Sequence, residues 1–149
     1  MAPMIALLAG TLLARLAGLL GADVLDGWQP ALRVGLALMF LLTGSAHFTA
    51  GRRHDLVAMV PPALPRPELL VTATGILELA GVVGLLVPAT ARWTALGLAL
   101  LMVAMFPANV SAARRGLTLA GRPVTRLGIR AAQQVLYVAA ALLVVLLPG

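Results

Sequence analysis

Five apolar runs of nearly membrane-spanning length follow one another along the chain, and short polar segments separate them. The hydrocarbon core of a bilayer is about 30 Å thick, so a helix needs roughly 20 apolar residues to cross it. We therefore predict an all-α integral membrane protein that forms one domain over residues 1–149. Its expected parts are a four-helix transmembrane core and an N-terminal helix that also spans, over residues 31–48, 67–87, 93–113, 125–147 and 4–20.

Composition supports the membrane class. The chain is 61% hydrophobic and only 11% charged, which is far fewer charges than a soluble domain of this length carries. The first apolar run contains Thr11 and Arg15 and lacks the basic segment that begins a signal peptide. It is also short for a span, so a helix lying in the membrane interface is the alternative for residues 4–20.

All eleven basic residues are arginines, and the net charge is +6. Most of them lie in short loops beside the apolar runs, where they face anionic membrane lipids, so we expect no nucleic-acid partner. The segments 49–66 and 114–126 hold most of these loop arginines. Cytoplasmic loops carry the excess of arginine in membrane proteins, so both segments are expected in the cytoplasm, with the C-terminus outside, in a bacterial cytoplasmic membrane.

Prolines and glycines predict how the helices end. Four prolines from Pro61 to Pro67 predict a stiff, extended crossing in the second half of a loop over residues 49–66. Pro107 predicts a kink near the end of its helix. Gly116 follows two arginines and predicts a helix C-cap, after which a polar loop leads to the last helix.

Glu78 lies near the middle of an apolar run, where a charged side chain costs several kcal/mol unless it faces a partner, a ligand or water. Gly75 and Gly81 share its helical face by their spacing of three residues. Together with Gly84 and Ala80 they should let a neighbouring helix approach closely. This face is therefore predicted to point into the bundle.

Polar residues of four predicted helices lie in the same half of the membrane, at a rise of about 1.5 Å per residue. We predict that they form one internal polar pocket, reached from the cytoplasmic side, with Glu78 at its floor. The candidate ligand-binding residues are His47, Glu78, Asn109, Gln134 and Tyr137. Alternatively, Glu78 is a structural carboxyl group bonded to Gln134, Tyr137 or a backbone carbonyl, His47 reaches the interface, and Asn109 and Gln133 join helices. The sequence identifies no catalytic residue, and its two histidines make no metal motif.

Several short segments, in this order, resemble the DoxX-like family of small bacterial membrane proteins. They are Thr43-Gly-Ser-Ala-His-Phe48, Met59-Val-Pro-Pro-Ala-Leu-Pro-Arg-Pro67, Gly75-Ile-Leu-Glu-Leu-Ala-Gly81, Leu85-Leu-Val-Pro88 and Phe106-Pro-Ala-Asn109. The resemblance covers residues 31 to 147 and implies a four-helix transmembrane core, to which the first run is an addition. It also implies a link to membrane redox complexes, because the family is named for subunits of a thiosulfate:quinone oxidoreductase.

Three functions are consistent with these features. The first is an accessory subunit of a membrane redox complex that holds a quinone or similar apolar ligand, with Glu78 and His47 bonded to its polar head. The second is a non-enzymatic lipid-binding or assembly protein, and the third is a small transporter with Glu78 as proton carrier. The expected partners are membrane lipids and either a redox protein or further copies of the chain. The absence of cysteine argues against a thiol-based role.

Overall fold

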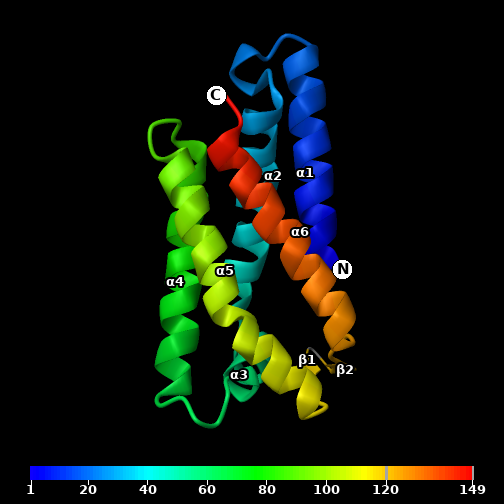
Figure 1. The fold of residues 1–149 in the computed structure, drawn as a ribbon, viewed down its shortest axis with the longest axis vertical. Helices are drawn as coiled ribbons and strands as arrows, with labels where there is room; N and C mark the ends of the chain where they lie inside the picture. The colour runs from blue at the N-terminus through cyan, green and yellow to red at the C-terminus, as the bar shows by residue number, and fades with distance from the viewer. Residues whose placement is uncertain (120, 149) are drawn as a thin grey trace.

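The computed structural model describes residues 1–119 and 121–148, and within them the fold is all-α, as predicted (Figure 1). A short 3-10 helix, η1, and a two-stranded hairpin complete the secondary structure. The elements are α1 (Ala2–Leu19), η1 (Asp23–Leu25), α2 (Trp28–Ala46), α3 (Ala50–Met59), α4 (Pro67–Leu86), α5 (Ala91–Arg114), β1 (Thr118–Leu119), β2 (Arg122–Pro123) and α6 (Leu127–Leu146).

Four helices form the core, and α1 is added to it. Helix α2 packs against both α4 and α6, α4 packs against α5, and α5 packs against α6. Helix α1 packs along the remaining side of α2 through a stripe that includes Leu7, Thr11 and Gly18. The core side chains between the four helices include Leu36, Phe40, Leu85, Leu98 and Val144.

The helix dimensions fit a bilayer. Among the described residues, α1, α4, α5 and α6 are each long and apolar enough to cross one, and α2 together with α3 is a fifth candidate bent by 90°. Large apolar side chains are exposed along the outer faces of these helices, for example Leu12, Ile76, Leu100 and Val135. Hydrocarbon would solvate these faces, whereas exposed patches of this extent are unusual on soluble monomers.

The two arginine-rich connections lie at the same end of the bundle. Figure 1 shows α3 and the β1–β2 hairpin at one end and the C-terminus at the other. This placement agrees with the prediction that residues 49–66 and 114–126 lie on the same side of the membrane.

The expected loop over residues 49–66 is wrong in its first half, where α3 forms. The first proline of this segment is Pro61, so no proline in residues 50–59 prevents helical hydrogen bonding. A helix of ten residues is marginal on its own, and tertiary contacts support this one. Met59 is buried, and Arg115 donates hydrogen bonds to the carbonyl oxygens of Ala58 and Val60 at 2.5 and 3.2 Å.

The other polar connection contains the β-hairpin rather than an unstructured loop, with Thr118 paired to Pro123 and Leu119 to Arg122. The predicted C-cap before it is confirmed. The amide of Gly116, at a φ of 61°, bonds the carbonyl of Ala113, and the amide of Leu117 bonds that of Ala112. This is the Schellman arrangement that glycine favours. Pro107 lies within α5, and the helix continues through it.

Arginines from neighbouring elements cap several helix C-termini, where carbonyl groups lack partners within the helix. Arg33 of α2 donates to the carbonyls of Leu85 and Leu86 at the end of α4, at 2.6 and 2.8 Å. Arg92 reaches the carbonyl of Leu147 after α6, at 3.2 Å. Each cation also interacts favourably with the negative end of a helix dipole. These arginines therefore join helices, in addition to any role in orienting the chain.

Replacing Arg33 with methionine should destabilise the bundle by about 1.5–3 kcal/mol, because it removes two hydrogen bonds from a charged donor, one part-buried and one exposed. Thermal unfolding of the purified protein in detergent measures the change. Arg52→Met is the matched control, since Arg52 is exposed on α3. Equal melting temperatures for both variants and the wild type would show that the cap contributes nothing.

Candidate functional site

The predicted inward face of α4 is confirmed. Its buried residues are Val71, Gly75, Glu78, Gly81 and Leu85, which recur every three or four positions. This stripe turns the carboxyl group of Glu78 toward α2, and Glu78 is only 4% exposed. Ala80 is exposed, so it takes no part in the close packing that was expected of it.

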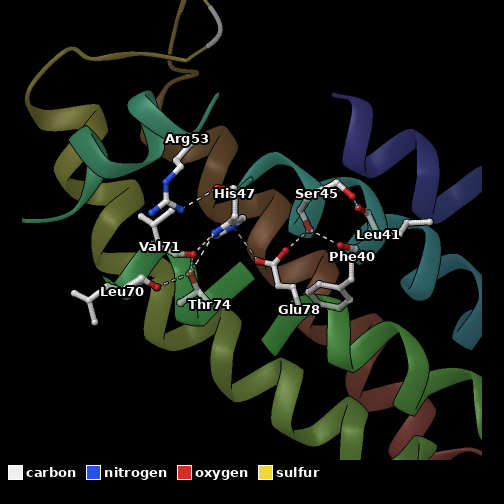
Figure 2. Close-up of polar contacts among 10 residues, drawn as sticks. Phe40, Leu41, Ser45, His47, Arg53, Leu70, Val71, Thr74 and Glu78 are labelled. Carbon is white, nitrogen blue, oxygen red and sulfur yellow. Dashed lines mark hydrogen bonds and ion pairs between the residues drawn. The ribbon is translucent and has the colours of Figure 1, made fainter. Parts of the chain in front are cut away.

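The carboxyl group of Glu78 meets the imidazole of His47 between α2 and α4 (Figure 2). His47 follows the last residue of α2, and its side chain is as buried as that of Glu78. His47 Nε2 lies 3.6 Å from Glu78 Oε1, which is an ion-pair distance and longer than a hydrogen bond. The alternative in which His47 reaches the membrane interface is therefore wrong.

The hydrogen bonds of the imidazole imply a proton between the two side chains. His47 Nδ1 lies 2.8 Å from the carbonyl oxygen of Val71, so Nδ1 must be the donor, because a carbonyl only accepts. Nε2 then faces the carboxyl oxygen, and two lone pairs would repel each other there. A stable pair therefore holds one further proton besides that on Nδ1, either on Nε2 or on the carboxyl group. Its net charge is zero in both forms, which reduces the cost of burying it.

Three residues around this pair were missed by the sequence analysis. The hydroxyl of Thr43 donates to Glu78 Oε2 at 2.5 Å. Thr74 Oγ1 lies 3.3 Å from His47 Nδ1. Arg53 donates to the carbonyl of His47 at 3.1 Å and to the hydroxyl of Thr72 at 2.9 Å. Thr43 was detectable, because it precedes His47 by four residues and so shares its helical face.

Glycines let the two helices come close enough for these contacts. A Cβ atom on Gly75 would lie 2.6 Å from Cβ of His47, and one on Gly44 would lie 3.2 Å from Cβ of Glu78. Each buried polar residue thus packs against a glycine of the opposite helix. We call Gly44, His47, Gly75 and Glu78 the α2–α4 lock.

The other predicted site residues do not join Glu78 in a single pocket. Asn109 of α5 accepts hydrogen bonds from Nε of Arg130 on α6, at 3.1 Å, and from its Nη2. The alternative in which Asn109 joins two helices is therefore confirmed, with a partner that the sequence analysis missed. Arg130 could have been noticed as a cation one turn into the last apolar run. Tyr137 is half-buried and packs against the apolar core.

Gln134 lies on a different surface. It lines an apolar hollow of about 310 Å³ on α5 and α6, together with Val103, Val135, Val138, Ala139 and Leu142. We call it the α5–α6 hollow. The side-chain nitrogen of Gln134 is buried, and none of the described residues accepts a hydrogen bond from it. Such orphaned donors are rare and call for an explanation.

Residues 36–145 match the family described as a domain of unknown function, DUF8561. The chain belongs to the DUF8561 family. The matched residues run from the second half of α2 nearly to the end of α6, so they contain the lock, the Asn109–Arg130 pair and the α5–α6 hollow. Helix α1 lies outside them. Comparison with curated proteins and with solved structures gives no match.

Gly75→Ala should destabilise the protein by about 1–3 kcal/mol, because the added methyl group overlaps the side chain of His47. Gly97→Ala is the matched control, since a Cβ at that α5 position meets open space. It should leave stability unchanged or raise it by up to about 1 kcal/mol through helix propensity. Thermal unfolding in detergent compares the two. Equal effects of the two substitutions on stability would mean that the packing of α2 against α4 does not depend on this contact.

Proposed function

We propose that the protein is a non-catalytic accessory subunit of a membrane redox complex, and that it holds a quinone or a similar carbonyl-bearing apolar ligand in the α5–α6 hollow. The observation that carries the proposal is the buried side-chain nitrogen of Gln134, which has no acceptor in the described part of the chain. An unpaired buried donor costs about 1–3 kcal/mol. A ligand carbonyl that accepts from this nitrogen would remove that cost.

The shape and lining of the hollow support a ligand of this kind. Its volume of about 310 Å³ is at the lower end of the range for small-molecule sites. Its lining is aliphatic except for Gln134. A quinone ring or a lipid acyl chain therefore fits it better than a charged metabolite does. The amide nitrogen is buried, so the Gln134 side chain must rotate toward the hollow before a ligand carbonyl can accept from it.

The lock is a less suitable place for the polar head of the ligand. The carboxyl oxygens of Glu78 already face His47 and Thr43, and both members of the pair are 4% exposed. A quinone that displaced these contacts would leave buried polar groups unpaired. The proposal therefore assigns the ligand to Gln134 and gives the lock a structural role.

The membrane setting and the resemblance support the redox part of the proposal. Residues 31–147 are similar to the DoxX-like family, which is named for subunits of a quinone-linked oxidoreductase. The arginine-rich end of the bundle would face the cytoplasm of a bacterium under the positive-inside rule, and the C-terminus would face outside.

Gln134→Leu should lower the quinone content of the purified protein by roughly tenfold, the equivalent of one lost hydrogen bond. Extraction and mass spectrometry of protein purified in mild detergent give the quinone-to-protein ratio. Gln133→Leu is the control, because the neighbouring amide faces Met1 rather than the hollow. Wild-type protein without quinone, or an equal loss in both variants, would contradict the proposal.

A second candidate, a non-enzymatic assembly protein that acts by helix contact, is favoured by the closed geometry of the lock. On this view Glu78 contributes only packing and hydrogen bonding.

Glu78→Gln should then be nearly silent, since an amide can still donate to His47 Nε2 and accept from Thr43. Glu78→Ala should cost about 3 kcal/mol or more, because it leaves buried partners unpaired. Thermal unfolding and size-exclusion profiles in detergent measure both effects. A large loss in Glu78→Gln would show that the ionised carboxylate itself is required.

A further inference from the structure

We propose that the junction of α5 with α6 binds the phosphate group of an anionic phospholipid between Arg114 and Arg126. This inference does not depend on the proposed function, because it concerns other residues, which lie at the N-terminal end of α6. The site is a hollow of about 380 Å³, which we call the arginine pocket.

Both arginines line this pocket, and both are exposed. Within the described part of the chain, neither guanidinium group has a hydrogen bond or an ion pair. The adjacent Arg115 is different, because it is bonded to Ser111 and to two carbonyl oxygens at the end of α3. Two cations thus remain available in the pocket, beside a third that the fold uses internally.

The start of α6 adds to the attraction for an anion. Arg126 is the N-cap residue, and no side chain caps the first turn. The first amide groups of a helix lack partners within it and point toward its start, where the helix dipole is positive. Thr125 and Leu127 line the pocket on either side of this N-cap residue.

The surroundings favour a lipid phosphate over a free one. The pocket lies where two helices of membrane-spanning length end, so the phosphate groups of the bilayer lie at the same depth. Leu117, Val124 and Leu127 give it apolar walls that suit the glycerol and upper acyl chain of a lipid. Arginine forms bidentate hydrogen bonds with phosphate, and two arginines match a single phosphodiester.

The test uses purified full-length protein, delipidated and titrated with phosphatidylglycerol or with phosphatidylcholine of the same acyl chains, read by native mass spectrometry. We expect phosphatidylglycerol to bind the wild type at least tenfold more tightly than phosphatidylcholine. The double variant Arg114→Gln/Arg126→Gln should lose roughly tenfold to thirtyfold of this affinity, the effect expected for two arginines near a membrane surface.

Arg122→Gln combined with Arg52→Gln removes the same charge at two exposed positions outside the pocket lining and should retain phosphatidylglycerol binding. Circular dichroism and melting temperature verify folding, which the double pocket variant should keep because its arginines bond no group within residues 1–119 and 121–148. Inorganic phosphate at the same concentration should not displace the lipid. Equal loss in the control variant, unchanged binding in the pocket variant, or displacement by inorganic phosphate would each overturn the proposal.

Discussion

The constraint on which this structure depends is that a polar group placed among apolar helices must find a partner there. Glu78 is the clearest case. Its carboxyl group lies on the buried stripe of α4, and His47 and Thr43 of α2 meet it. The contact needs close helices, which Gly44 and Gly75 allow. The lock therefore couples the position of α4 to the bend after α2, and through Arg53 to α3.

The same constraint explains the arginines. A chain with eleven arginines and few acids has few ion pairs available, and backbone carbonyls at helix ends serve as acceptors instead. Arg33, Arg92 and Arg115 each bond the C-terminal end of a helix other than their own. The side-chain oxygen of Asn109 likewise accepts a hydrogen bond from Arg130 of the neighbouring helix. In this fold arginine works as a cross-helix cap at both ends of the bundle.

Some polar side chains have no partner among the described residues, and these are the candidates for binding a ligand. Gln134 keeps a buried donor on an apolar surface, and Arg114 with Arg126 keeps two exposed cations beside a helix start. The proposed functions use these groups, because a group without a protein partner can gain one from a ligand. Glu78 was the most conspicuous polar residue of the sequence, yet its partners lie within the protein.

The sequence by itself determined the class of fold and the inward face of α4. Apolar runs of about 20 residues can only be accommodated as long helices, and a spacing of three or four residues puts Glu78 beside Gly75 and Gly81. It also determined the C-cap at Gly116, since that conformation depends on local backbone freedom. Proline marked the end of the loop at Pro67 but could not reveal α3. That helix is stabilised in part by Arg115, which lies 57 and 55 positions beyond the two residues whose carbonyls it bonds.

Only the tertiary structure decided which polar residues meet. Depth along a helix is readable from the sequence, and it placed His47, Glu78, Asn109, Gln134 and Tyr137 in the same half of the membrane. Two residues at one depth touch only if their helices are neighbours and their faces are turned together. That depends on how α2, α4, α5 and α6 pack, which is set by many contacts between distant parts of the chain. For this reason His47 and Glu78 form a pair, while Asn109 meets Arg130 and Gln134 faces a separate hollow.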